Sequence, residues 1–165
     1  MSTQPAAPAF GLRTAEPRDL PAVIDMIREL AQFERLEHLV AIEPAAFAQH
    51  LFGPKPVVEG VVAEADGAPV AHALFFTSYS TFLGKPGLWL EDLYVRPAWR
   101  GAGIGTALLR HLAALATERG CGRFEWSVLD WNEPAIGFYE RMGATLLPDW
   151  RICRVTGDAL RRIAG

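Results

Sequence analysis

The sequence predicts an α/β domain with a mixed central sheet and helices on both faces. Apolar, strand-like runs alternate with segments whose apolar residues recur at helical spacing. Two of these runs are separated by Asp66-Gly67, which is a hairpin signal. A strand, a glycine-rich loop, a helix and another strand follow one another in the second half of the chain. The chain has 165 residues, half of them hydrophobic, which is enough for one domain over residues 10–165 after a disordered tail, 1–9.

The individual elements follow from the spacing of the apolar residues. Leu20, Val23 and Ile24 begin a helical repeat that continues to Ala31, and Pro17 suits a first helical turn. The other expected elements, in chain order, are a short helix near Pro44–Leu51, strands at Val57–Ala65, Pro69–Phe76 and Gly87–Val95, a helix over Ile104–Ala116, a strand over Arg123–Leu129, a helix that begins at Asn132-Glu133-Pro134 and ends at Gly143, a strand over Trp150–Val155 and a short basic C-terminal helix.

Composition narrows the class of partner. The net charge is −3 and no block of Lys or Arg is long enough to follow a nucleic-acid backbone, so we expect no nucleic-acid partner; a small cationic substrate fits better. Every longer apolar stretch is interrupted before it reaches the length of a bilayer span. Met1–Pro8 lacks the pattern of a signal peptide. We therefore expect a cytoplasmic protein with no membrane partner.

Neither the cysteines nor the histidines suggest a metal site. Cys121 and Cys153 lie in strand-like surroundings and are expected to be buried free thiols. The four histidines have no partner at ligand spacing; they are His38, His50, His72 and His111. We predict no bound metal.

The run Arg100-Gly101-Ala102-Gly103-Ile104-Gly105 stands where a strand turns into a helix. Backbone N–H groups at the positive end of a helix dipole bind phosphate, which makes this run a candidate phosphate loop. A Walker loop is excluded because Thr106 follows Gly105 with no lysine before it. The dinucleotide fingerprint fits poorly because Thr106 occupies the place of its third glycine. A turn that only joins strand to helix remains an alternative.

Several motifs together resemble one family. Leu90–Val95, Arg100–Thr106, Asp130–Pro134 and Phe138-Tyr139 are similar to the motifs of the GCN5-related N-acetyltransferase superfamily and, within it, of the spermidine/spermine N-acetyltransferase family. Ser80-Thr81 and Asp130-Trp131-Asn132 resemble its thialysine N-ε-acetyltransferase branch. The resemblance implies the fold of that superfamily, acetyl-CoA as cofactor, direct acetyl transfer to a small primary amine, and a homodimer.

The resemblance also implies a set of site residues. The cofactor would be bound by Leu93, Tyr94, Val95, Arg100, Gly101, Ala102, Gly103, Ile104, Gly105, Thr106, Asn132, Glu133, Pro134 and Tyr139. The amine would be bound by Phe33, Glu34, Glu91, Asp92, Glu125, Trp126, Ser127 and Asp149. Tyr139 would protonate the departing thiolate, although helical spacing also allows it to be a core residue, and Asn132 suits a helix cap.

The chemistry requires a base, because an amine with a pKa of about 10 is mostly protonated at neutral pH. Glu91 is the expected base, acting directly or through water. Strand alternation predicts that Glu91 and Asp92 point to opposite faces, where burial and like charge would raise a carboxyl pKa. The alternative is that these two residues are structural partners of arginines.

The substrate prediction rests on a shortage of acids. Tyr79-Ser80-Thr81 has hydroxyls where the polyamine enzymes carry an acid, and Asp149 is the one carboxylate just before Trp150. Several separated ammonium groups need several carboxylates, so the sequence favours thialysine or another lysine-like amine over spermidine. Polyamine acetylation, acetylation of a protein lysine or N-terminus, and a CoA-binding sensor without turnover remain as alternatives.

Overall fold

The computed structural model describes residues 9–165, which form two compact units. One unit ends at Ser127 and the other spans Val128–Gly165. Apart from residue 9, the predicted disordered tail lies outside the described residues. None of the described helices has the length and apolarity that a bilayer crossing requires.

The first unit is built on a five-stranded sheet in the order β1-β2-β3-β4-β5. The strands are β1 Gly11–Thr14, β2 Glu59–Ala65, β3 Ala68–Ser80, β4 Lys85–Val95 and β5 Arg123–Trp126. The first four strands pair antiparallel with their neighbours, whereas β5 pairs parallel to β4. The predicted mixed sheet is therefore confirmed.

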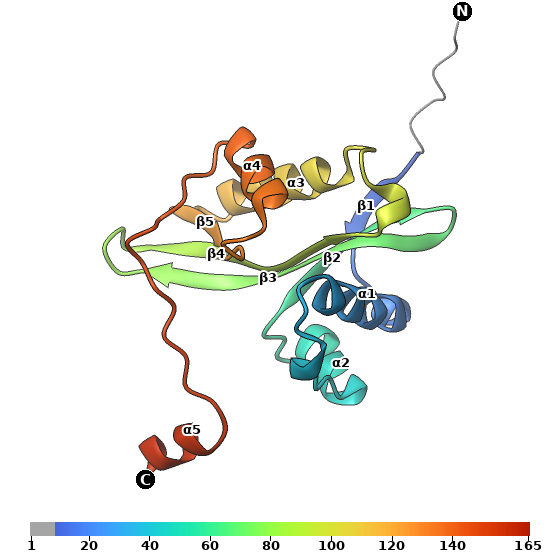
Figure 1. The fold of residues 1–165 in the computed structure, drawn as a ribbon. Helices are drawn as coiled ribbons and strands as arrows, with labels where there is room; N and C mark the ends of the chain where they lie inside the picture. The colour runs from blue at the N-terminus through green and yellow to red at the C-terminus, as the bar shows by residue number, and fades with distance from the viewer. Residues whose placement is uncertain (1–8) are drawn as a thin grey trace, which may run out of the picture. The chain divides into compact units, whose positions relative to one another are not determined.

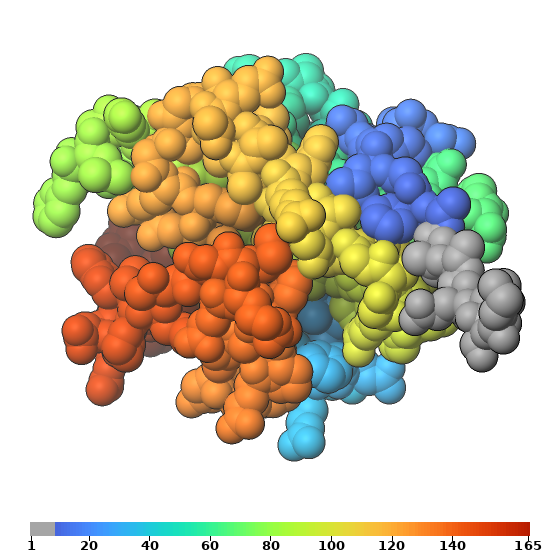
Figure 2. Space-filling view, turned by 90° about the horizontal axis from the view of Figure 1, so that it is seen from above, coloured from blue at the N-terminus to red at the C-terminus, as the bar shows by residue number. Residues whose placement is uncertain are grey.

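Helices cover both faces of this sheet, as the sequence predicts. The helices of the first unit are α1 Leu20–Phe33, α2 Pro44–Phe52 and α3 Ile104–Glu118, with 3-10 turns at Pro17–Asp19, Glu37–Leu39 and Pro97–Trp99. The α1 and α2 helices lie on one face and α3 lies on the other (Figure 1). Figure 2 looks down on the second of these faces, where α3 is the yellow to light orange stretch.

A tight turn joins β2 to β3. Asp66 and Gly67 both have positive φ angles, of 52° and 77°. Two consecutive residues with positive φ produce a turn whose twist matches that of the flanking strands. The hairpin predicted from Asp66-Gly67 is confirmed.

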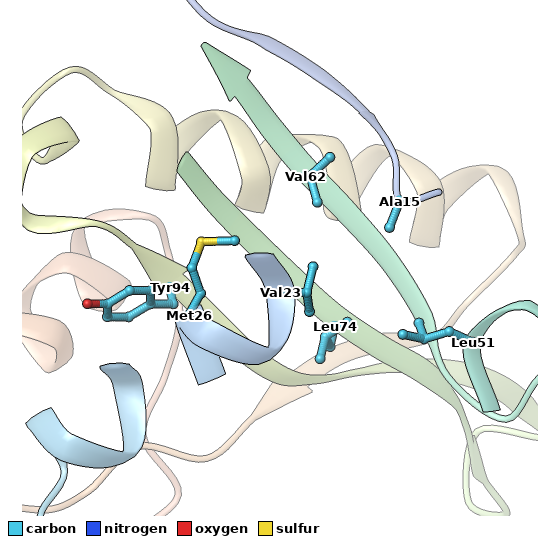
Figure 3. Close-up of a cluster of buried hydrophobic side chains, with 7 residues drawn as sticks. All are labelled: Ala15, Val23, Met26, Leu51, Val62, Leu74 and Tyr94. Atoms are coloured by element: carbon cyan, nitrogen blue, oxygen red, sulfur yellow. The ribbon is translucent and has the colours of Figure 1, made fainter. Parts of the chain in front are cut away.

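The face beneath α1 and α2 holds a hydrophobic cluster (Figure 3). Six of its residues come from the two helices and from the strands they cover, and the seventh, Ala15, directly follows β1: Ala15, Val23, Met26, Leu51, Val62, Leu74 and Tyr94. Met26 and Val62 are completely buried. Burial of a side chain of this size contributes about 1.5–3 kcal/mol, so the cluster fixes α1 against the sheet.

The β1 strand is absent from the sequence predictions because Gly11–Thr14 is too short to show alternation. The guanidinium of Arg13 holds it in place through ion pairs with Asp19, at 2.6 Å, and with Glu64 on β2. The hydrogen bond from Arg13 lowers the pKa of the buried Asp19 carboxyl. This contact also fixes the chain at the start of α1.

The second unit contains α4 Glu133–Arg141 and α5 Gly157–Ala164. The Asn132 side chain accepts a hydrogen bond from the N–H of Ala135 at 3.4 Å, as expected of a helix cap. The chain leaves α4 through Gly143, whose φ of 96° is accessible mainly to glycine. Both predicted helices of this region are confirmed.

Two strand predictions need correction. Trp150–Val155 forms no strand, and Trp150 and Ile152 are 77% and 69% exposed. Alternating apolar residues make a strand only where another strand offers a hydrogen-bonding edge, and the second unit has no other strand. In addition, β5 ends at Trp126 rather than Leu129.

The cysteine prediction is correct only in part. Both thiols are free, but Cys121 is half-buried and Cys153 is exposed because its expected strand does not form. Across residues 9–165, no three His, Cys, Asp or Glu side chains gather closely enough to hold a metal ion.

Candidate active site

The glycine-rich loop joins β4 to α3 in the first unit. Gly101 and Gly103 have φ angles of +80° and +82°. A Cβ placed on either glycine would meet no atom within 4 Å, so backbone conformation rather than crowding requires glycine there. Gly103 caps α3 without any side-chain hydrogen bond. The N–H groups of the first helical turn are therefore available to an anion.

Arg100, at the start of this loop, fastens it to two other elements. Its Nε donates to the carbonyl oxygen of Val95 at 2.9 Å. Its guanidinium lies 5.6 Å from the ring centroid of Tyr94 and 5.8 Å from that of Phe33, at the end of α1. Cation–π contacts of this length are attractive, so Arg100 holds the loop against β4 and α1.

The β4 strand continues past the end of β5. Their last aligned pair is Leu90 and Trp126, yet β4 runs on to Val95. On this side, Glu91–Val95 therefore has no partner strand among the described residues. Leu93 and Val95 lie within this free edge, whose amides can pair with an extended ligand. The sequence does not reveal this separation of the strands.

Two predicted cofactor residues have side chains that point into the core. Tyr94 is 6% exposed and belongs to the cluster under α1. Burial, followed by a hydrogen bond with Glu29, raises its pKa. Ile104 is 1% exposed. These two residues can offer a cofactor their backbone groups only.

Glu91 forms a β-bulge. Asp92 is aligned with Leu74 and Leu90 with Phe75, which leaves Glu91 without a partner on β3. The Nε1 of Trp89 donates to a carboxylate oxygen of Glu91 at 3.0 Å.

The bulge cancels the alternation between the two acids. Asp92 shares the face of Leu74, which packs against α1. Trp89 lies on the same face, because its ring contacts Phe76, two residues after Leu74 on β3. Glu91, which is bonded to Trp89, therefore reaches this face as well. The predicted opposite orientation of Glu91 and Asp92 is wrong because the extra residue shifts the alternation by one.

Three acids meet at this point. Burial, and then the negative charges of Glu91 and Glu34, raise the pKa of Asp92 to about 6. Burial also raises the pKa of Glu34, at the end of α1. No arginine pairs with Glu91 or Asp92 within residues 9–165, so the alternative of arginine partners finds no support. An anionic site that is partly shielded from water can accept a cation or a proton.

The β5 residues divide between the two faces of the sheet. Glu125 is aligned with Trp89, on the face of the acids, and pairs with the Nε of Arg123 at 2.6 Å. Trp126 is aligned with Leu90, and its ring lies 4.9 Å from that of Phe124, on the opposite face. Ser127 follows the strand and is exposed. The structure thus brings Glu125, but not Trp126, to the face that carries Glu91 and Asp92.

Arg123, which is not among the predicted site residues, lies beside Glu125 on the same face of the sheet. Its signal in the sequence was an opposite charge two residues from Glu125 on a strand, which places both side chains on one face.

The remaining predicted residues belong to the second unit. Asn132 caps α4, and Glu133 and Pro134 form its first turn. Tyr139 lies two turns further along, half-buried, with its ring 5.4 Å from that of Phe138. Asp149 is exposed in a turn beyond α4.

Comparison with known proteins assigns this chain to a class. The family model described as "Acetyltransferase (GNAT) family" matches residues 22–144. This chain belongs to that family and is an N-acetyltransferase.

Named relatives cover almost the whole chain. Thialysine N-epsilon-acetyltransferase of Mus musculus is 39% identical, over 93% of this chain and 96% of that protein. L-ornithine N5-acetyltransferase of Arabidopsis thaliana is 33% identical, over 92% of this chain and 86% of that protein. The resemblance predicted from the sequence motifs is confirmed.

A solved structure supports the fold independently. An integron cassette protein from the mobile metagenome of V. cholerae superposes with a TM-score of 0.78 at 23% identity, and the match covers 94% of this chain and 97% of that one. The predicted fold class is confirmed.

Proposed function

We propose that this enzyme transfers the acetyl group of acetyl-CoA directly to the distal primary amine of a small, lysine-like amino acid such as thialysine. The observation that carries the proposal is the free edge of β4, which begins with two of the three carboxylates and ends just before the glycine-rich loop. The names of the relatives support the choice of amine, since thialysine and ornithine are both amino acids with a distal amine.

The residues present suit acetyl-CoA. Backbone N–H groups of Gly101–Thr106 would bind the pyrophosphate at the positive end of α3. Leu93 and Val95 would pair through their backbones with the amides of the pantetheine chain. We assign Asn132, Glu133 and Pro134 to the cofactor from the sequence motif alone. Acetyl-CoA supplies the acetyl group as a reactive thioester.

Side chains of this enzyme would transfer two protons during the reaction. The ammonium group first gives one proton to a carboxylate. The free amine nitrogen then forms a bond to the acetyl carbon, the carbon–sulfur bond breaks, and the second proton lost by the nitrogen balances the one that the thiolate gains. We assign that carboxylate to the Glu91 and Asp92 pair. Asp92 is favoured because its raised pKa brings it close to the working pH, whereas Glu91 is engaged by the indole of Trp89. Tyr139 would protonate the thiolate.

Cation recognition follows from the same cluster. Glu34, Glu91 and Asp92 bring three acids to one place on the face of the sheet that α1 covers. One ammonium group at this place is well compensated. A polyamine carries further ammonium groups that would need acids elsewhere, and polyamine acetylation is the alternative function.

We also propose a cytoplasmic homodimer in which residues 10–165 act as one domain. The family model spans both units, which supports a single functional domain. The exposed apolar residues of the second unit, among them Trp150, Ile152 and Ile163, support a second copy as their cover. The exposed thiol of Cys153 suits a reducing compartment.

The decisive test is release of CoA from acetyl-CoA across thialysine, lysine, ornithine, spermidine, other diamines and peptides. We expect the highest kcat/KM with thialysine or a similar amino acid. A tenfold preference for spermidine would establish the polyamine alternative, and turnover of peptides alone would establish a protein acetyltransferase.

A further inference from the structure

Side chains from three neighbouring strands form two rows on the face that carries Glu91. Phe76, Trp89 and Glu125 are aligned across β3, β4 and β5. Ser78, Gly87 and Arg123 form the adjacent row.

Contacts confirm that both rows point to one face. The rings of Phe76 and Trp89 lie 6.4 Å apart. A Cβ on Gly87 would approach Ser78 Oγ at 2.6 Å and Arg123 Cγ at 3.3 Å.

Each of the two rows contains one charged side chain, and the two charges are opposite in sign. Arg123 and Glu125 pair through Nε and Oε2 at 2.6 Å, with side chains that are 41% and 28% exposed. This pairing engages Nε, and no other acceptor for the guanidinium occurs among the described residues. Beneath it, the buried hydroxyl of Ser78 also has no partner there. The ion pair is thus partly exposed to solvent, and N–H groups of the Arg123 guanidinium remain available to a ligand.

Gly87 makes this arrangement possible. It is buried on β4 between Ser78 and Arg123, and any larger residue would displace their side chains. The stem of Arg123 therefore lies against Gly87, and its guanidinium lies beside Glu125.

We propose that Arg123 and Glu125 bind the α-carboxylate and the α-ammonium of an amino-acid substrate, and so select amino acids over diamines and polyamines. This inference rests on the proposed function. In a zwitterionic head group, a single carbon atom separates the carboxylate from the ammonium group. Arg123 and Glu125 are in contact and therefore place the two complementary charges side by side. Arginine is suited to carboxylates because its planar guanidinium forms two parallel hydrogen bonds.

The distance along the sheet suits a side chain of the length of lysine. Asp92 follows Trp89, the neighbour of Glu125, by three residues on β4, one of which is the bulged Glu91. The two residues lie opposite Leu74 and Phe76, two residues apart on β3, which corresponds to roughly 7 Å along the sheet. The indole of Trp89 fills the interval and is bonded to Glu91 at its far end. A methylene or thioether chain can pack on this ring while its distal amine reaches the acids.

The same arrangement disfavours a far ammonium group that has no carboxylate beside it. A diamine of equal length would place its far ammonium at Glu125, as the amino acid does, but it would supply no carboxylate for the adjacent guanidinium of Arg123, whose positive charge would then repel it. Specificity then has an attractive and a repulsive part.

The test pairs changes in the enzyme with changes in the substrate. We would measure kcat/KM for thialysine, thialysine α-carboxamide and bis(2-aminoethyl) sulfide, with wild type, Arg123→Gln and Arg123→Lys. We expect R123Q to lower kcat/KM for thialysine by roughly 30-fold, the range of a lost charge-assisted hydrogen bond, and to change that for the carboxamide by less than threefold. The diamine should improve with R123Q, and R123K should lie between R123Q and wild type.

The α-ammonium is tested in the same manner. Glu125→Gln should lower kcat/KM for thialysine and leave N-α-acetylthialysine nearly unaffected. Arg18→Gln is the matched control, because it removes a surface arginine paired with Glu16 at 2.7 Å. It should leave the ratio between thialysine and the diamine at the wild-type value.

The outcomes separate the two proposals. An equal loss with thialysine and its carboxamide in R123Q would show that the ion pair is structural only, and the subsite assignment would fall while the proposed function stands. Absence of turnover of both thialysine and the diamine by wild type would overturn the proposed function and the subsite together. Equal thermal midpoints of R123Q, R123K and wild type exclude misfolding as the cause.

Discussion

The indole nitrogen of Trp89 donates a hydrogen bond to the carboxylate of Glu91 at 3.0 Å, and this contact gives two adjacent acids different surroundings. Glu91 bulges out of the strand and is held by Trp89, whereas Asp92 lies beneath the end of α1 with its pKa raised to about 6. Under the proposed function, proton transfer belongs to Asp92, and Glu91 contributes to binding of the cation.

The pH dependence of the rate distinguishes the two acids. A base must be ionised to accept a proton, so we expect kcat/KM of the wild type to rise through a pH of about 6. Asp92→Asn should lower kcat/KM by roughly a hundredfold or more and abolish this limb. Glu91→Gln should retain the limb with a smaller loss. The measurement is kcat/KM against pH at a fixed concentration of free amine. If E91Q abolishes the limb and D92N keeps it, Glu91 is the base.

The raised pKa of Asp92 also predicts how stability changes with pH. The folded carboxyl takes up its proton at about pH 6 and the unfolded one near 3.8, so the folded state binds more protons between these values. Stability should therefore fall as pH rises from about 4 to 6, and the cost is fully present above 6. A shift of this size corresponds to about 3 kcal/mol as an upper limit.

The same variant, Asp92→Asn, reports this cost. It should increase the free energy of unfolding at pH 8 by about 1–3 kcal/mol and change it little at pH 4. Urea unfolding at the two pH values provides the measurement. An equal effect at both pH values would contradict a raised pKa of Asp92. Replacing the carboxyl by an uncharged amide removes only the pH-dependent part of the free energy of unfolding.

The phosphate loop is tested with two glycines of similar conformation. Gly103→Ala places a side chain at a φ of +82° beside the backbone that would meet a pyrophosphate, so we expect the KM for acetyl-CoA to rise tenfold or more. Gly67→Ala is the control, because its φ is +77° and its position is the remote hairpin turn. Both variants should lose about 1 kcal/mol of stability. A similar KM in both would argue against cofactor binding by this loop.

His72 provides a test outside the site. It is completely buried between strands, neither ring nitrogen has a hydrogen-bond partner within residues 9–165, and burial followed by the charge of Arg96 lowers its pKa to about 3. An unsatisfied buried polar group costs about 1–3 kcal/mol, so His72→Leu should stabilise the protein at pH 8.

Acid adds a second effect at His72. The unfolded histidine takes up a proton near pH 6.5 and the folded one near 3, so wild-type stability should fall as pH decreases through this range. H72L should remove this contribution, which amounts to about 2 kcal/mol at pH 5. Urea unfolding between pH 5 and 8 measures it. Unchanged acid sensitivity in H72L would show that His72 is not the group responsible.

Features that depend on nearby residues were predictable from the sequence. The loop, α3 and the Asp66-Gly67 turn follow from glycine positions and apolar spacing within about fifteen residues. The bulge at Glu91 and the early end of β5 depend instead on how distant strands align, and no local pattern records them. Trp150–Val155 shows the converse, because its alternation is present while the partner strand is not.

The free edge of β4 has a consequence for the protein without its ligands. Unpaired backbone groups along a strand invite pairing with another chain, which is a route to aggregation. A bulge and charged side chains are the devices by which native sheets prevent this, and β4 has both at Glu91 and Asp92. We expect the two acids to keep this edge closed to a neighbouring chain and, under the proposed function, open to the amides of the cofactor. Substitutions that remove both charges should make the free enzyme prone to self-association, and bound CoA should suppress it.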